Sequence, residues 1–250
     1  MKNVVFIPNV NIDNVQHIGY QCSINSWKHW CKKNNCELFI WEDLIFPMEE
    51  MKVTWQRYYV FDMLEANNIE YDQILMVDAD MIVHPDCPNF FNDTNNKFTS
   101  VHDYGVYEWI LRSIENYSKH VFNGHMIDFW KYINGGFQIV NKNHKDFYKK
   151  ILEFYNTNKD LLLQVQQSYG VGTDQTVLNF LLELENIDVK LLPYEYNMGN
   201  MPAKEILDDE LTFTKIGYIY HFNGIPDKEK SVPFWMKKTY DHLFGQLTKN

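Results

Sequence analysis

The sequence predicts an α/β fold of Rossmann-like type, in which a mixed but mainly parallel sheet is flanked by helices in a single domain. The first reason is the order of the elements, because short apolar runs alternate with segments of helical spacing along residues 1–103. Such alternation is typical of a parallel sheet wrapped by helices. The second reason is size, since 250 residues with 45% hydrophobic content can bury one large core.

Three strands joined by two helices are expected in the first part of the chain. The runs VVFIP (4–8), CELFIW (36–41) and QILMVD (73–78) are short and apolar, as buried strands are. A helix is expected over 14–34 and a second one over 53–67. The first of these helices has apolar residues at the spacing of one helix face, namely Tyr20, Ile24, Trp27 and Cys31.

The second part of the chain is expected to add shorter strands, which make the sheet mixed, and three helices. The strands are predicted at 97–103, 135–142, 188–193 and 217–222. One helix starts near Asn143, with Phe147, Ile151, Phe154 and Tyr155 on one face. The next has Thr173 as its N-cap and carries Val177, Leu178, Leu181 and Leu182. A terminal helix is predicted from Phe234 to Leu247, and the aromatic segment 104–132 shows no clean helical period.

The composition limits the partners and the location of the protein. The net charge is -10 and no run of Lys or Arg is present, so nucleic acid is not expected as a partner. The four cysteines form no CxxC pair and are expected to be reduced thiols. The first ten residues do not form a signal peptide and no apolar run reaches 18 residues. We therefore expect a cytoplasmic protein without a transmembrane segment.

The pair Asp78-Ala79-Asp80 at the end of the third predicted strand is the sharpest chemical feature. Ligands of parallel sheets bind beyond the carboxyl ends of the strands, and residues i and i+2 of an extended segment point the same way. Two such carboxylates repel each other unless a cation or proton lies between them. Mg²⁺ or Mn²⁺ would satisfy both and leave coordination sites for a diphosphate. The alternative is a pair of solvated acidic residues in a turn.

His221 ends the last predicted strand and could complete such a site. Two carboxylate oxygens and one imidazole favour Mn²⁺ over Mg²⁺. The alternative is a structural histidine, because a single histidine after an apolar strand is more often part of the packing.

Two glycine-containing segments are further candidates for ligand contacts. Paired glycines in Asn134-Gly135-Gly136 let a backbone approach a ligand closely, although a plain turn or bulge also explains them. The loop 170–175, Gly-Val-Gly-Thr-Asp-Gln, brings an acid and an amide to a helix N-terminus. A Thr173 cap with Asp174 near the helix dipole explains two of these residues but leaves Gln175 unexplained.

Taken in order, these segments resemble glycosyltransferase family 8, the family of glycogenin and the bacterial lipopolysaccharide galactosyltransferases. The resemblance covers about residues 53–224 and lies in TWQRYYVFDML, ILMVDADMIV, YINGGFQIVNK, GTDQTVLNF, VKLLPYEYN and YHFNG. It implies the GT-A fold and a Mn²⁺-dependent hexosyltransferase, with Mg²⁺ as a possible substitute. The implied donor is a nucleotide-sugar such as UDP-glucose or UDP-galactose, and the implied acceptor is a glycan, a glycoconjugate or another hydroxyl compound. Transfer is expected to retain the anomeric configuration.

The same resemblance implies roles for individual residues. Asp78, Asp80 and His221 would bind the metal, which bridges the donor phosphates. Asp174 and Gln175 are expected to be catalytic, and Trp109 is expected to stack on an acceptor sugar. The residues expected at the donor are Asn9, Arg57, Asp78, Asp80, Asp103, Asn134, Gly135, Gly224 and Lys228. Residues 1–103 are expected to form the nucleotide-sugar-binding half of one 1–250 domain, and 104–250 the acceptor-side and catalytic half.

The sequence departs from the family at two places. Family members usually carry Asp and Tyr after the first strand for the nucleoside, whereas this chain has Pro8-Asn9-Val10-Asn11. The family also places a Lys two residues after the motif His-Phe-Asn-Gly. Here the first lysine is Lys228, so Lys228 or Lys230 would have to contact the phosphate through a shifted loop.

Three other functions share some of these sequence features. Phosphatases of the haloacid dehalogenase type use a D-x-D motif, but normally on the first strand. Sugar-phosphate nucleotidyltransferases have a Gly-rich opening loop that this chain lacks. A non-catalytic sugar-binding module would keep the aromatic residues without needing the metal-binding group.

Overall fold

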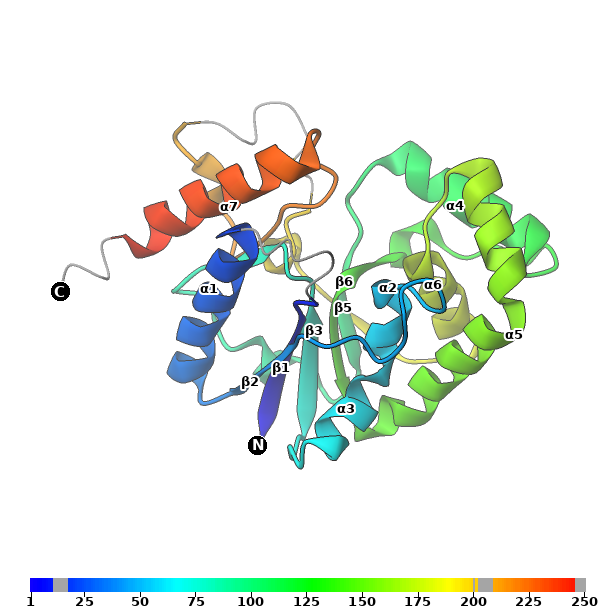
Figure 1. Ribbon diagram of the computed structural model, residues 1–250, viewed down its shortest axis with the longest axis horizontal. Helices are drawn as coiled ribbons and strands as arrows, with labels where there is room; N and C mark the ends of the chain where they lie inside the picture. The colour runs from blue at the N-terminus through cyan, green and yellow to red at the C-terminus, as the bar shows by residue number, and fades with distance from the viewer. Residues whose placement is uncertain (11–17, 200, 202–208, 246–250) are drawn as a thin grey trace.

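The computed structural model describes residues 1–10, 18–199, 201 and 209–245 (Figure 1). A six-stranded sheet in the order β2-β1-β3-β6-β5-β7 forms its centre. Only β6 runs antiparallel to its neighbours β3 and β5, and the other pairings are parallel. The strands are β1 (Asn3–Pro8), β2 (Glu37–Trp41), β3 (Gln73–Val77), β5 (Phe98–His102), β6 (Ile133–Asn141) and β7 (Val189–Leu192).

Helices cover both faces of this sheet, with α1 and α7 on one side and α3 to α6 on the other (Figure 1). The α-helices are α1 (Ile18–Asn34), α2 (Val53–Gln56), α3 (Val60–Ala66), α4 (Tyr107–His120), α5 (Lys145–Tyr169), α6 (Asp174–Leu184) and α7 (Lys228–Phe244). Short 3₁₀ turns are η1 (Arg57–Tyr59), η2 (Phe90–Asp93), η3 (Phe129–Lys131), η4 (Lys142–His144), η5 (Tyr194–Tyr196) and η6 (Thr212–Lys215).

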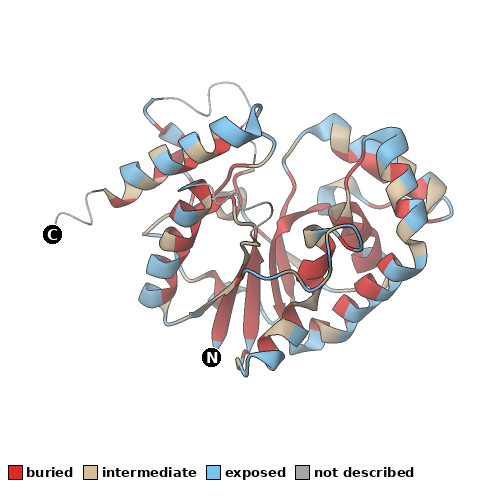
Figure 2. Cartoon of the chain, viewed as in Figure 1, coloured by how far each residue is buried: buried red, intermediate tan, exposed pale blue. Residues whose placement is uncertain are grey.

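The strands of the sheet are buried on both faces because successive side chains point to opposite sides. In β1, Val4 and Phe6 pack with residues of α3 to α6, whereas Val5 and Ile7 pack against Trp27 of α1. All of these β1 side chains are fully buried, and the central strands are buried along their length (Figure 2). The predicted mixed, mainly parallel sheet flanked by helices is thus confirmed.

A second, two-stranded sheet lies beyond the end of β3. It pairs β4 (Met81–Val83) antiparallel with β8 (Ile219–His221). The predicted strand at 217–222 is present in shortened form, but β4 was not predicted, because its three residues are too few to show a strand pattern of their own. A third apolar cluster fills the space between this ribbon, α1 and α7.

Several helix predictions are wrong in detail. The segment 53–67 is interrupted by the 3₁₀ turn η1, which turns Arg57 and Tyr58 inward to a buried hydrogen-bond partner. The segment 104–132 contains the regular helix α4. Its buried positions are Ile110, Ser113, Ile114, Tyr117 and Ser118, and this stripe was obscured by the two serines within it and by aromatic residues beside it.

Helix ends also differ from the predictions. Thr173 stands at the N-cap position of α6, but its hydroxyl donates to the Asp174 carboxylate at 2.9 Å and makes no capping bond. Helix α7 begins at Lys228, six residues before the predicted start, because Pro233 falls in its second turn without ending it. The predicted start of the first helix lies outside the described residues, as does the predicted end of the last one at Leu247. Within the described ranges, no helix has the length and apolar character needed to cross a membrane.

Candidate metal centre and ligand cavity

Asp78 is held at the carboxyl end of β3 by the neighbouring antiparallel strand. The register of the two strands sets Val77 opposite Phe137 of β6. Directly beyond this pair, the Asp78 amide donates to the Gly136 carbonyl at 3.0 Å. The chain then turns, and β4 starts at Met81, which leaves Asp80 between the two sheets.

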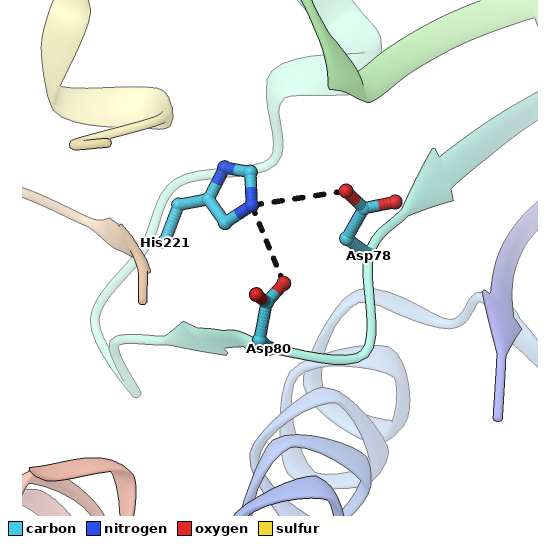
Figure 3. A group of neighbouring side chains, drawn as sticks. All are labelled: Asp78, Asp80 and His221. Atoms are coloured by element: carbon cyan, nitrogen blue, oxygen red, sulfur yellow. Dashed lines mark ion pairs between the residues drawn. The ribbon is translucent and has the colours of Figure 1, made fainter. Parts of the chain in front are cut away.

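His221 reaches this place through the two-stranded sheet, because Met81 of β4 is paired with His221 of β8. Its Nε2 lies 3.3 Å from Asp80 Oδ1 and 3.7 Å from Asp78 Oδ2 (Figure 3). One ligand atom from each of the three side chains lies within 4.8 Å of the others. The structure therefore assembles the three side chains that the sequence predicted as metal ligands.

The donor set and its surroundings fit a divalent cation. Two carboxylates and one imidazole are suitable ligands for first-row metals as well as for Mg²⁺. The backbone of β6 passes directly beneath them. A Cβ atom on Gly136 would lie 2.6 Å from Asp78 Oδ2 and 2.8 Å from His221 Cε1, so glycine is needed for these two side chains to converge.

The three groups shift one another's ionisation. Burial raises the pKa of Asp78, although the Arg57 guanidinium acts in the opposite direction. Burial would also raise the pKa of Asp80, but the adjacent His221 outweighs it, so the pKa of Asp80 is lowered. The pKa of His221 is raised, because the charges of Asp80 and Asp78 outweigh the effect of burial. Negative potential thus concentrates where a cation would bind.

Arg57 connects the metal-binding group to the start of α6. Its Nη1 donates to Asp78 Oδ1 at 2.8 Å and its Nη2 donates to Asp174 Oδ2. The Tyr58 hydroxyl donates to the same Asp174 oxygen at 3.1 Å. Both members of the Arg57–Asp174 pair are buried, so this ion pair is shielded from water.

Gln175 and Asp103, which were predicted beside the donor sugar, form a second connected group. Gln175 Oε1 accepts from the Gly135 amide at 2.8 Å, and its Nε2 donates to Asp103 Oδ2 at 2.6 Å. Gly135 lacks a side chain for a steric reason, since a Cβ would lie 3.0 Å from Arg57 Nη2 and 3.2 Å from Gln175 Cβ. The paired glycines lie inside β6 and not in a turn before it.

Two cavities meet at Asp78 and Asp80, which together with His221 could hold a metal ion. Five residues line both of them, namely Thr54, Arg57, Asp78, Asp80 and Lys228. The first, of about 350 Å³, extends to Pro8, Asn9 and Val10 at the end of β1 and to Tyr20 of α1. The second, of about 310 Å³, is also lined by Trp109, Asn134, Asp174, Gln175, His221 and Asn223. A separate hollow of about 540 Å³ beyond β7 is lined by none of the predicted site residues.

Unpartnered polar atoms are found at these cavities. Thr54 Oγ1, Arg57 Nε and Asn223 Oδ1 are buried and have no hydrogen-bond partner within the described part of the chain. Buried polar groups are normally hydrogen-bonded, so exceptions that line one place indicate a ligand site.

Most predicted site residues converge here, but not all of them do. Asn9 lines the first cavity, and Trp109 lies in the wall of the second, where its ring packs over Gly172. Asp103 and Gly135 line neither cavity, but both are hydrogen-bonded to Gln175, which lines the second. Gly224 is exposed, has φ +66°, and lines neither cavity.

Sequence reasoning missed four residues of the site, namely Tyr20, Thr54, Asn197 and Asn223. Tyr20 was assigned to a helix face, and Thr54 has no charge or motif to mark it. Asn197 and Asn223 lie in VKLLPYEYN and YHFNG, two of the segments that carry the resemblance, so their place in those segments was an available signal.

Comparison with known proteins supports the fold but gives no sequence relative. Neither a known protein family nor a curated protein matches the sequence. A solved glycosyltransferase involved in the glycosylation of the major capsid of PBCV-1 superposes with a TM-score of 0.65 at 12% identity, covering 95% of this chain and 99% of that one. The glycosyltransferase GlyE of Streptococcus pneumoniae gives a TM-score of 0.55 at 12% identity. All of this chain is covered in that match, and it spans 64% of GlyE. The predicted GT-A type of α/β fold is confirmed, and the resemblance to family 8 itself stays a prediction.

Proposed function

We propose that this protein is a metal-dependent glycosyltransferase that moves a sugar from a nucleotide-sugar donor to an acceptor hydroxyl. The observation that carries the proposal is the group Asp78, Asp80 and His221, which lies between two cavities at the carboxyl end of β3. The fold is one that glycosyltransferases also adopt. Because likeness of fold alone does not give function, we infer the function from the residues of this site.

The two cavities suggest how a donor would lie. The nucleoside would occupy the first cavity, near Asn9 and Val10, and the donor sugar would occupy the second, near Asn134 and Gln175. A metal bound between them would offset the charge of the diphosphate and so stabilise the leaving nucleoside diphosphate. Lys228, which lines both cavities, is proposed as the phosphate contact.

We propose Mn²⁺ as the metal and a UDP-hexose, UDP-glucose or UDP-galactose, as the donor. The halves expected from the sequence, 1–103 for the donor nucleotide and 104–250 for acceptor and catalysis, would then meet at the metal. An imidazole beside two carboxylates supports Mn²⁺ over Mg²⁺.

The contacts of Asp174 bear on the stereochemical course. Its Oδ2 accepts from Arg57 and Tyr58, and its Oδ1 accepts from Thr173. A carboxylate engaged in this way is a poor nucleophile, because attack would break hydrogen bonds to a buried charge. For the retaining transfer that the resemblance implies, this favours front-face attack guided by the leaving phosphate over a covalent intermediate, with Asp174 and Gln175 orienting the donor sugar.

The proposed acceptor contact is Trp109, on the first turn of α4 and in the wall of the second cavity. Trp109→Ala should raise the acceptor KM, while slow hydrolysis of the donor by water continues at its normal rate. A parallel fall of hydrolysis and transfer would assign the ring to the structure and not to the acceptor.

The function is tested by incubating the protein and Mn²⁺ with UDP-, GDP- and dTDP-sugars and following turnover by mass spectrometry. We expect one UDP-hexose to be consumed in a metal-dependent way, and Asp80→Asn to abolish this turnover without unfolding the protein. Binding of free sugar without any requirement for metal or nucleotide would instead support a sugar-binding module.

A further inference from the structure

The second ring nitrogen of His221 is bound by a residue with no assigned role. His221 Nδ1 lies 3.2 Å from the side-chain oxygen of Asn197. Asn197 Nδ2 donates in turn to Asn134 Oδ1 at 3.1 Å, and the Gly136 amide donates to that same Asn134 oxygen at 2.9 Å. The side chains of these residues are buried, so water does not compete with the chain of hydrogen bonds.

The Gly136 amide, which ends this series of hydrogen bonds, fixes which atom donates in each of the others. A backbone N–H can only donate, so the atom of Asn134 that faces Gly136 must be its oxygen. The atom of Asn197 that faces this oxygen must then be its NH₂ group. Its other atom, the oxygen, faces His221 and can only accept, so Nδ1 must carry a proton. Nε2, which faces Asp78 and Asp80, is then the nitrogen whose lone pair can bind a metal.

The backbone holds Asn197 in place for this contact. The Met198 amide donates to the Ile219 carbonyl at 2.9 Å, and the His221 amide donates to the Met198 carbonyl at 3.0 Å. The segment that carries Asn197 is therefore paired to β8, the strand that carries His221. Both side chains are almost fully buried, at 3% and 2% exposure.

We propose that Asn197 is a positioning residue that fixes His221 as the Nδ1–H form and presents Nε2 to the divalent cation. The same chain of bonds fixes Asn134, whose oxygen is occupied by two donors. Only its Nδ2 can then contact a ligand in the second cavity, so Asn134 acts there as a donor to a sugar oxygen. This inference rests on the metal of the proposed function, and it links the metal-binding and sugar-binding parts of the site.

The test uses two substitutions at one position. Asn197→Leu keeps the approximate shape and removes both bonds, whereas Asn197→Asp keeps an acceptor for Nδ1. The imidazole is observed by ¹⁵N NMR of metal-free protein, with His221 assigned through a His221→Gln variant. Wild type and Asn197→Asp should show a protonated Nδ1, and Asn197→Leu should lose the Nδ1 proton when the ring is neutral.

Affinity for Mn²⁺ alone is measured in parallel by electron paramagnetic resonance. Loss of a residue that orients a metal-bound histidine lowers metal affinity by about 10- to 100-fold, which we expect for Asn197→Leu. The control is Asn141→Leu, which removes a buried asparagine at the opposite end of β6 and should leave Mn²⁺ binding unchanged.

Two results would overturn the inference. One is a wild-type protein in which Nδ1 lacks the proton, a measurement that requires no variant to fold. The other is an Asn197→Leu protein with wild-type Mn²⁺ affinity. If the wild type has a protonated Nδ1 but binds no Mn²⁺, the proposed function fails while the chain of hydrogen bonds is supported.

Discussion

Gly136 offers a direct way to test whether Asp78 and His221 act together on a metal. Its backbone conformation is accessible to any residue, so Gly136→Ala adds only a methyl group. The new Cβ would lie 2.6 Å from Asp78 Oδ2 and 2.8 Å from His221 Cε1. An ordinary contact needs at least 3.4 Å, so both side chains must move away from position 136. Metal–ligand distances hold within about 0.2 Å, so both displacements exceed what a metal site tolerates.

We therefore expect Gly136→Ala to weaken Mn²⁺ binding by about 10- to 100-fold, roughly 1.4 to 2.7 kcal/mol. Asp78 is partly exposed and can move, whereas His221 is enclosed, so the strain should affect the metal site more than the core. The assay is Mn²⁺ titration of the purified variant, with its thermal unfolding midpoint measured beside it.

Gly199→Ala is the matched control, because it adds a methyl group on the Asn197 side of His221. There the new Cβ would lie 3.6 Å from Asn223 Oδ1 and 4.0 Å from His221 Nδ1, which are ordinary contacts. It should bind Mn²⁺ like wild type. If Gly136→Ala also binds Mn²⁺ with wild-type affinity and a normal unfolding midpoint, Asp78 and His221 do not bind one ion together.

Three further results are expected. Gln175→Ala should lower kcat by about 10²-fold, roughly 3 kcal/mol, with a smaller effect on donor affinity; near-normal turnover would remove Gln175 from the reaction. Because the pKa of His221 is raised, Mn²⁺ must displace a proton, so calorimetry in buffers of different ionisation enthalpy should show proton release and an affinity that rises with pH; buffer-independent heats would contradict this. Burial lowers the pKa of His144 to about 4 from its usual 6.5, so the unfolded chain binds a proton at this residue before the folded protein does. The free energy of unfolding should therefore fall by roughly 3 kcal/mol as the pH falls from 6.5 to 4. His144→Gln should remove this pH dependence, while the glutamine side chain can still accept a hydrogen bond from the Asn141 amide. If the pH profile of stability is unchanged in this variant, His144 does not cause the pH dependence.

The first half of the fold was predictable because its signals are local. Apolar runs and helical spacing correctly indicated β1, β2 and β3 and the buried residues Trp27 and Cys31 of α1. The segment of α4 was not recognised as a helix, because its buried stripe contains Ser113 and Ser118, and the aromatic residues Tyr107 and Trp109 lie outside that stripe. Amphipathic patterning is a weak guide where aromatic residues lie outside the core.

The three candidate metal ligands were proposed by combining a local motif with a resemblance, and neither source gave their geometry. Nothing in the sequence near Asp80 shows that Met81 pairs with His221, since that depends on chain folding over a long separation. The role of Gly136 was equally hidden, because a missing Cβ gains meaning only when the neighbouring strand and β8 are in place. Asn197 is a similar case, since the orientation of its side-chain amide is fixed through Asn134 by the Gly136 backbone amide of β6.

The two-stranded ribbon of β4 and β8 also has a consequence for how the protein folds. Each strand is three residues long, yet their pairing closes a loop that contains all of β5, β6 and β7 and the helices between them. Closing so long a loop is entropically costly, so contacts of this kind form late in folding. We therefore expect the imidazole to join the two carboxylates only after the central sheet has formed. An ion held by all three groups would connect the two ends of that loop. Its binding free energy would add to the free energy needed to open the ribbon locally.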